Sequence, residues 1–406
     1  KTVVRLLDPQ PHDGLALGVE HVERKTVVRL RVQQPALGRR RLRARVHVSP
    51  VRGYDKALQR VDAALRGELG FPAADQPLLD EAVTASGGTP GGSPAKIAVA
   101  LAPGQRADSA AAAVLKALIA VTEANLPGTI ADTDSEFLHD LRVSVRRSRA
   151  VQRELRRVLP PAELARFRGA FQWLQRVTGD VRDLDVYVLE FDTMRALVPA
   201  QIRADLDPLL ALLHRRRAAA RRRMVRALRS ERTAALLADW AALLERLESL
   251  PVENRPDATR PIGTVAGERI AKVYRRMVKM GEAIDDLSPS DEYHELRKQG
   301  KELRYLLELF GAPLYPDEVV RPMIRALKGL QDVLGRHQDR EIQVALLRSL
   351  GPELSGAAGG PAALMAVGVL VQRLAADQQE AKDAFARRFG AFASRRQRNQ
   401  VGDTFA

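Results

Sequence analysis

The amino-acid sequence predicts a mainly α-helical protein in which a unit of roughly four helices occurs twice, preceded by a small α+β segment. Three observations support this prediction. From about residue 106, apolar residues recur at helical spacing almost to the end of the 406-residue chain. Two motifs each occur twice in the same order, which is typical of an internal duplication. Within the first 50 residues, two stretches alternate polar and apolar side chains with period two, as strands do.

The N-terminal region, residues 1–83, carries the strand signals. "VVRLRV" (27–32) and "RLRARVHV" (41–48) predict two strands, and residues 55–69 predict an amphipathic helix. A linker is expected over 84–105, since glycine, proline and serine dominate its first part. In the second strand one face carries Arg41, Arg43, Arg45 and His47.

The helical region is expected over 106–400, in two halves of about 106–250 and 262–400. The proline-rich, polar segment 250–263 separates the halves. Clusters of Pro, Gly, Ser and Asp predict the other helix breaks at 126–133, 159–163, 197–200, 287–290, 311–318 and 351–361.

The two repeated motifs lie at equivalent places in these halves. "HDLR" at 139–142 matches "HELR" at 294–297, and basic residues follow each at matching offsets. Further on, "LQRVTGDVRDLDV" (174–186) matches "LQDVLGRHQDREI" (330–342). Such agreement in order and spacing predicts that the two halves arose from one unit.

Each histidine-led helix carries a stripe of basic side chains beside its apolar face. Spacings of three and four residues place the members of a stripe on one side of a helix. Like charges at this spacing repel each other, so the stripes favour a bound polyanion whose phosphates the guanidinium groups grip in pairs. A basic stripe on one helix is often only a solvated face, but here it occurs twice. The candidate binding residues are His139, Arg142, Arg146, Arg149, Arg153, His294, Arg297, Lys301 and Arg304, with Arg276, Lys279 and Lys328 from two further stripes.

Composition points to the same class of partner. The formal net charge is +15 and the pI is about 10.4, which favours nucleic acid, an anionic membrane or polyphosphate. Aromatic residues make up only 4% of the chain, and this scarcity argues against nucleic acid. The chain has no cysteine, which excludes disulfides and thiolate metal sites and is consistent with a cytoplasmic protein. We find no uninterrupted apolar run of about 18 residues, so membrane insertion is not expected.

Catalytic motifs are not evident. The sequence contains no P-loop, no G-x-S-x-G elbow and no H-E-x-x-H. Neighbouring His139 and Asp140 diverge by 100° on a helix and do not chelate one metal ion together. We therefore predict no catalytic residues, no metal site and no cofactor.

The helical region resembles the CHAD family, the conserved histidine α-helical domain. The resemblance rests on "HDLRVSVRRSR", "LQRVTGDVRDLDV", "HELRKQGKELRYLLELF" and "LKGLQDVLGRHQD", and covers roughly 106–395. It implies a pair of four-helix bundles related by pseudo-two-fold symmetry, a basic central cavity, and inorganic polyphosphate as the ligand. It also implies association with polyphosphate granules, as for some members. The second copy departs from the first at Gly300, in the place of Val145, and at Glu308, in the place of Arg153.

The N-terminal region weakly resembles part of a CYTH domain, the triphosphate-tunnel barrel that often precedes CHAD domains. Basic strands followed by a helix carry this resemblance, although the E-x-E-x-K strand that opens the barrel is missing. The expected function is polyphosphate binding without catalysis. The alternative is a metal-dependent triphosphate hydrolase that acts through the CYTH-like region, and a nucleic-acid binder is a third possibility.

Overall fold

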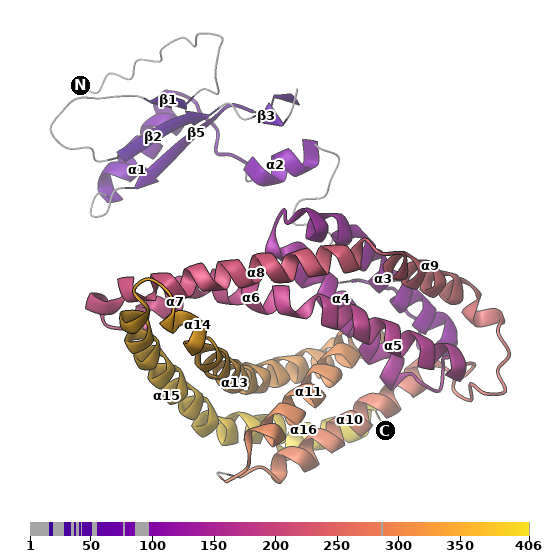
Figure 1. The fold of residues 1–406 in the computed structure, drawn as a ribbon. Coiled ribbons are helices and arrows are strands. Elements are labelled where there is room, and N and C mark those ends of the chain that lie inside the picture. Colours follow the sequence, from indigo (N-terminus) through magenta and orange to yellow (C-terminus); the bar gives the residue numbers. More distant parts are fainter. Residues whose placement is uncertain are drawn as a thin grey trace. The chain divides into compact units, whose positions relative to one another are not determined.

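The computed structural model describes residues 16–18, 28–33, 36–37, 40–41, 43–50, 55–75, 78–85, 97–285 and 287–405 (Figure 1). The chain divides into two compact units, Lys1–Gly92 and Ser93–Ala406. The boundary falls within the linker predicted over 84–105, of which residues 86–96 lie outside the described residues.

The N-terminal unit contains a three-stranded antiparallel sheet in the order β1-β2-β5. The second predicted strand begins four residues later than expected, because residues just before it form the separate pair β3 and β4. The predicted helix is confirmed, while α2 was not predicted. The elements are β1 (Ala16–Gly18), β2 (Val28–Gln33), β3 (Ala36–Leu37), β4 (Arg40–Arg41), β5 (Arg45–Pro50), α1 (Asp55–Ala63), the π-helical turn η1 (Ala64–Glu68) and α2 (Leu78–Ala85).

The C-terminal unit is mainly α-helical, as predicted. Its first half contains α3 (Ala107–Ala131), α4 (Ser135–Glu154), α5 (Pro161–Val177), α6 (Gly179–Leu189), α7 (Phe191–Ala196), α8 (Asp207–Leu228) and α9 (Glu231–Arg246). Its second half contains α10 (Ile262–Glu282), α11 (Ser290–Leu306), the π-helical turn η5 (Leu307–Gly311), α12 (Ala312–Leu314), α13 (Asp317–Ser349), α14 (Gly351–Ser355), α15 (Gly360–Phe392) and α16 (Arg395–Phe405).

The two halves are not separate packing units. The larger apolar core joins α3, α4, α5 and α9 of the first half to α10, α11 and α16 of the second. A smaller core joins α6, α7 and α8 to the end of α13, to α14 and to the start of α15. Figure 1 shows α13 and α15 running side by side, and α8 lying along α6. Because each core draws on both halves, neither half buries its apolar side chains alone.

Two predicted breaks are wrong or too wide. α3 continues through Pro127 to Ala131, so the break expected from residue 126 begins only at Asp132, where φ is 60°. A proline within a helix removes one backbone hydrogen bond and crowds the preceding turn, and here that cost falls only in the last turn. The break expected over 311–318 shrinks to Tyr315 and Pro316 because η5 and α12 continue the helical path.

One helix in the described part of the chain, α3, is long and apolar enough to cross a membrane by length and composition. A stretch of 18 residues within it has a mean hydropathy of 1.4, and 56% of that stretch is buried inside the protein. α3 packs against α4 and α9, and core helices of soluble proteins share this composition. The expectation of no membrane insertion stays a prediction.

Candidate functional site

The repeated helices α4 and α11 pack against each other in the C-terminal unit (Figure 1). α4 begins after Asp134, whose carboxylate accepts a hydrogen bond of 2.8 Å from the backbone N–H of Glu136. Leu138, Leu141 and Val145 are buried on its core face. The basic stripe borders that face, so the amphipathic pattern holds its cations at the junction of the two helices instead of in open solvent.

The first arginine of each basic stripe lies beside the glycine of the second repeated motif in its own half of the chain. A β-carbon built on Gly179 would lie 3.7 Å from Nη1 of Arg142, and one on Gly335 would lie 3.9 Å from Nε of Arg297. Arg297 also pairs with Asp339 at 3.0 Å. In both halves, the guanidinium group of this arginine therefore lies beside the glycine of the second repeated motif.

Arg142 also holds the α5–α6 junction. Its Nη1 donates to the backbone oxygen of Gln175 at 2.8 Å and to Oγ1 of Thr178 at 2.9 Å. Burial, followed by the repulsion of Arg146 and Arg182, lowers the pKa of Arg142 to about 10, although the carboxylate of Asp183 opposes this shift. Arg142 is thus a half-buried cation that also anchors the junction of α5 and α6.

Arg146 and Lys301 lie near each other, and the carboxylates of Asp183 and Asp339 act on them only at longer range. Within the described residues, neither side chain has an ion pair or a hydrogen bond, and the Nε of Arg146 is buried. Burial, then the nearby charges of Arg297 and Arg146, lower the pKa of Lys301 to about 7. Arg149 likewise has no partner in the described part of the chain, and burial together with Arg153 lowers its pKa. We call Arg142, Arg146, Arg297, Lys301 and Arg304 the central cation cluster.

The cluster opens into a pocket of about 470 Å³ between α6, α11 and α13. Arg297, Lys301 and Arg304 line it from α11. Arg336 and Arg340 line it from α13, and both pair with Asp377 of α15. We did not select these two arginines from the sequence, although they lie within the second repeated motif. Their acidic neighbours in that motif masked the basic pattern.

Two residues of the predicted stripes, Arg153 and the cluster member Arg304, already have acidic partners. Arg153 pairs with Glu154 at 3.2 Å and with Glu302 at 2.6 Å. Arg304 lies 3.3 Å from the carboxylate of Glu308 and donates to Gln331 at 3.1 Å. Arg304 remains at the pocket wall, whereas Arg153 joins the two helices structurally.

Three predicted residues lie apart from the pocket. Arg276, on the exposed side of α10, is near the carboxylates of Glu295 and Glu302. Lys279 lines a different pocket, between α10 and α16. Lys328 is exposed on α13 and does not line the central pocket. The structure therefore does not bring these three into the central cation cluster.

The two repeated histidines are both half-buried but differ in their surroundings. Burial and the positive charge of Arg182 lower the pKa of His139. His294 shares a hydrogen bond of 2.5 Å between its Nδ1 and the side-chain oxygen of Gln338. Each histidine is thus held at the edge of the cluster, near the start of its helix.

The arginine-rich helix α8 contrasts with the cluster. Arg217 pairs with Asp132 at 2.6 Å and with Asp185 at 2.5 Å, and Arg221 pairs with Asp132 at 3.1 Å. Arg223 lies 3.5 Å from Asp180. Much of the positive charge of α8 is therefore already balanced within the protein.

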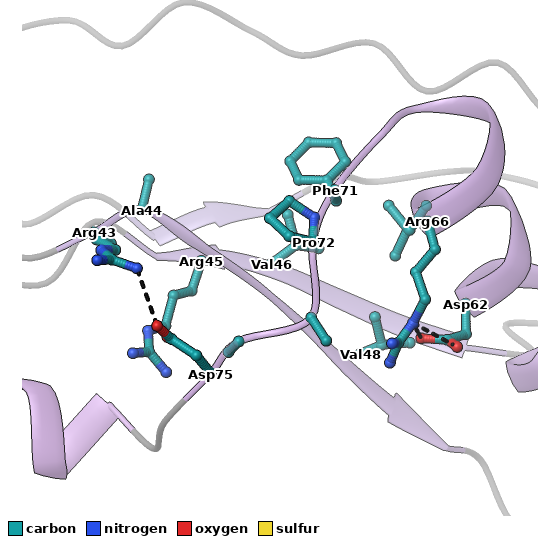
Figure 2. A pocket seen from close by; sticks show the side chains of 13 residues that line it. Arg43, Ala44, Arg45, Val46, Val48, Asp62, Arg66, Phe71, Pro72 and Asp75 are labelled. Atoms are coloured by element: carbon teal, nitrogen blue, oxygen red, sulfur yellow. Dashed lines mark hydrogen bonds and ion pairs between the residues drawn. The ribbon is translucent and has the colours of Figure 1, made fainter.

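A second basic pocket lies in the N-terminal unit, with a volume of about 550 Å³. Figure 2 shows Arg43 directed towards Asp75 and Arg66 towards Asp62, at distances of 3.4 and 2.9 Å. Arg45 pairs with Glu81 at 2.5 Å. These cations have acidic partners, unlike Arg146 and Lys301. Among the described residues of the chain, no group of three or more His, Asp or Glu side chains is arranged to hold a metal ion.

Relatives in sequence are found in Mycobacterium tuberculosis. The uncharacterized protein MT2285 of strain CDC 1551 / Oshkosh is 29% identical over 221 residues, which covers 50% of this chain and 38% of the relative. The uncharacterized protein Rv2226 of strain ATCC 25618 / H37Rv matches with the same identity and coverage. The aligned part of this chain thus spans well under half the length of these curated relatives.

Solved structures share the fold. The crystal structure of the CHAD domain from the plant Ricinus communis is 26% identical with a TM-score of 0.59, covering 73% of this chain and 96% of that one. PptA from Streptomyces chartreusis is 20% identical with a TM-score of 0.54, covering 70% and 99%, and shows likeness of fold alone. The CHAD domain family model matches residues 113–348. Since this match spans more than half of the sequence and includes both histidine-led helices, the chain belongs to the CHAD family.

Proposed function

We propose that the protein binds inorganic polyphosphate through the central cation cluster, without catalysis. The observation that carries the proposal is the placement of Arg146 on α4 near Lys301 on α11, where neither side chain forms an ion pair among the described residues. The CHAD domain is linked to polyphosphate binding in general. For this chain the site itself supports the assignment.

The electrostatic cost of the empty cluster favours a polyanion. Gathering cations at a half-buried junction is unfavourable, as the lowered pKa values of Arg142 and Lys301 reflect. A chain of phosphates supplies closely spaced negative charges and many acceptor oxygens, which suit both the guanidinium fork and the ammonium group. Binding would relieve the repulsion that the folded protein sustains.

The proposal includes a duplicated architecture, with two four-helix bundles related by pseudo-two-fold symmetry. Its support is the common order of helices, in which α3 and α4 of the first half correspond to α10 and α11 of the second. The matching contacts of Arg142 with Gly179 and of Arg297 with Gly335 add to it. Under this arrangement the anion would lie across both repeated helices.

The N-terminal unit would be a partial CYTH-like region. Its support is the antiparallel sheet β1-β2-β5 with arginines along β5 and the residues just before it. The alternative function, metal-dependent triphosphate hydrolysis, would use this unit. Phosphate release from triphosphate in the presence of Mg²⁺ or Mn²⁺ would favour that alternative over binding alone.

A salt series tests the proposal. Titration of the full chain with linear polyphosphate should show affinity falling steeply with ionic strength, because bound cations release counterions. With about four contacts, the affinity should fall on the order of 50-fold between about 50 and 200 mM salt. A DNA duplex at the same salt should compete weakly. Absence of binding at low salt, or DNA binding as tight as polyphosphate binding, would refute the proposal.

A further inference from the structure

Lys301 differs chemically from the residue that matches it in the other repeat. The equivalent position on α4 is Arg146, and a guanidinium group stays protonated in proteins. An ammonium group gives up its proton when burial and neighbouring cations disfavour the charge, and the free amine is then a nucleophile. The cluster therefore contains a lysine where an arginine would hold the same charge permanently.

The surroundings of Lys301 come from four helices. Arg297 and Arg304 flank it on α11, and Arg146 faces it from α4. On α13, Asp339 is the acidic group that acts on it and also pairs with Arg297. The remaining charged groups of the same pocket are Arg336, Arg340 and Asp332 from α13 and Glu190 from the junction of α6 and α7.

Burial is the main cause of the lowered pKa of Lys301, and the neighbouring cations lower that pKa further than the carboxylate of Asp339 raises it. The resulting pKa of about 7 leaves roughly half of the side chains as free amine at neutral pH. An ordinary lysine, with a pKa near 10.4, has on the order of one free amine in a thousand there. The pocket of about 470 Å³ gives small molecules access to this amine.

We propose that Lys301 is a reactive amine that acyl phosphates acylate, with the arginines of the cluster holding the phosphate group. The lone pair of Nζ attacks the carbonyl carbon of the acyl phosphate and forms a C–N bond. The C–O bond to the phosphate breaks, and inorganic phosphate leaves with that electron pair. The amine loses one proton, which the leaving phosphate or solvent accepts, and the product is a neutral amide.

The arginines make an acyl phosphate a better donor than other acyl compounds. Arg297 and Arg304 line the same pocket as Lys301, about one turn before and one turn after it on α11, so a phosphate that they bind would hold its acyl group near Nζ. The product amide carries no charge, so acylation removes a cation from the cluster. It would therefore weaken any polyanion binding at this site.

Acetyl phosphate is the probe that tests the proposal. The full chain is incubated at pH 7 with acetyl phosphate, and acetylation at each lysine is followed by mass spectrometry of peptides over short times. Lys298 is an internal reference, since it is exposed on the same helix and pairs with Glu295 at 2.6 Å. Lys301 should react on the order of tenfold faster than Lys298, because far more of it is free amine. Equal rates at the two lysines would overturn the proposal.

Two further comparisons separate the reactivity of the Lys301 amine from the positioning of the phosphate group by the arginines. An acetyl N-hydroxysuccinimide ester carries no phosphate, so its preference for Lys301 should be several-fold smaller than that of acetyl phosphate; an equal preference would refute guidance by the arginines. Arg146→Gln should slow acetylation of Lys301 several-fold, whereas Arg222→Gln, which removes an exposed cation on α8, should not. Equal rates in both variants would contradict the role given to the cluster.

These measurements contain no polyphosphate, so they are independent of the proposed function. Selective acetylation of Lys301 in a protein that fails to bind polyphosphate would leave this inference standing and remove the proposed function. Polyphosphate binding without selective acetylation would do the reverse.

Discussion

Arg297 of α11 and Asp339 of α13 are joined by an ion pair of 3.0 Å at the wall of the central pocket. The pair sets the carboxylate of Asp339 in competition with any anion for the same guanidinium group. Asp339 is also the acidic group that partly offsets the repulsion around Lys301. The carboxylate of Asp339 thus neutralises part of the positive charge that would otherwise attract a polyanion.

Asp339→Asn should strengthen polyphosphate binding. The change removes a negative charge from the pocket and frees Arg297, and since the carboxylate is largely exposed, the gain should be modest, about two- to fivefold. Titration at one fixed salt concentration measures it. Asp403→Asn, an exposed carboxylate on α16 that lines another surface, is the matched control and should have little effect. Weaker binding by Asp339→Asn would show that the ion pair positions Arg297 for the ligand.

Polyphosphate affinity should decrease as pH rises from about 6 to 8, and Lys301 should be the main cause. Below its pKa of about 7, Lys301 is charged before binding. Above that pKa the free protein must take up a proton to offer the ammonium group, which costs binding free energy. Lys301→Gln should remove most of this dependence.

The histidines provide the comparison for that experiment. Burial and Arg182 lower the pKa of His139 below its usual value, so its protonation on binding would affect the affinity at lower pH than Lys301 does. The His139→Gln, His294→Gln double variant should therefore keep the dependence between pH 7 and 8. If this variant loses it while Lys301→Gln keeps it, the histidines are the groups that take up protons.

Stability should fall with rising pH through the titration of Glu302. This side chain is buried between α4 and α11, where it pairs with Arg153 and shares a hydrogen bond with Glu154, which in turn pairs with Arg269. Burial, with Arg153 opposing it and Glu154 adding to it, raises the pKa of Glu302 from 4.5 to about 7. Between these values the unfolded chain releases the proton and the folded protein keeps it, so the free energy of unfolding decreases as pH rises.

Glu302→Gln isolates this contribution. Denaturant unfolding at pH 5 and pH 7.5 gives the free energy of unfolding of the parent and of the variant. From pH 5 to pH 7.5 the parent should lose on the order of 2 kcal/mol of stability relative to the variant. The comparison uses the change of the free energy of unfolding with pH and not its absolute value, because the variant also weakens the contact with Arg153 at every pH. Parallel pH profiles would show that Glu302 is ionised in the folded protein throughout.

Gly281→Ala should destabilise the C-terminal unit by about 1–3 kcal/mol. A β-carbon at Gly281 would lie 2.0 Å from the ring of Phe389 on α15, which itself stacks on Phe385. Gly169→Ala on α5 is the control, because nothing lies within 4 Å of a β-carbon there. That change should stabilise the protein by about 0.5–1 kcal/mol, as glycine is a poor helix former. Equal effects on the midpoint of thermal unfolding would contradict the packing of α10 on α15.

The sequence predicted the helical region and the two histidine-led helices within it, because helical periodicity and repeated motifs can be read directly along the chain. The second repeated motif contains the glycines beside which Arg142 and Arg297 lie, but the sequence did not show that proximity. The two departures of the second copy have structural reasons. A β-carbon on Gly300 would lie 3.3 Å from Gln331, so the larger Val145 of the first copy has no room there. Glu308 pairs with Arg147 of α4 and with Arg304.

Sequence spacing could not show which cations remain unpaired. The partners of Arg153, Arg217 and Arg340 lie on helices far away in the chain, and only the tertiary fold brings their carboxylates within 3 Å. Arg153 was therefore predicted as a ligand-binding residue, whereas its charge joins α4 to α11. Arg336 and Arg340 were missed because their positions at the pocket depend on how α13 packs.

The most direct test compares two double variants that each replace two basic residues with glutamine. Arg146→Gln with Lys301→Gln empties the centre of the cluster, while Arg222→Gln with Arg226→Gln removes two exposed cations from α8. Calorimetric titration with linear polyphosphate of defined length, at a single salt concentration, gives the dissociation constant of each. We expect the cluster variant to bind on the order of 100-fold more weakly, since two charge-assisted contacts are lost, and the α8 variant to change less than about threefold. Equal losses in the two variants would show that diffuse surface charge, and not the junction of α4 and α11, binds the polyanion.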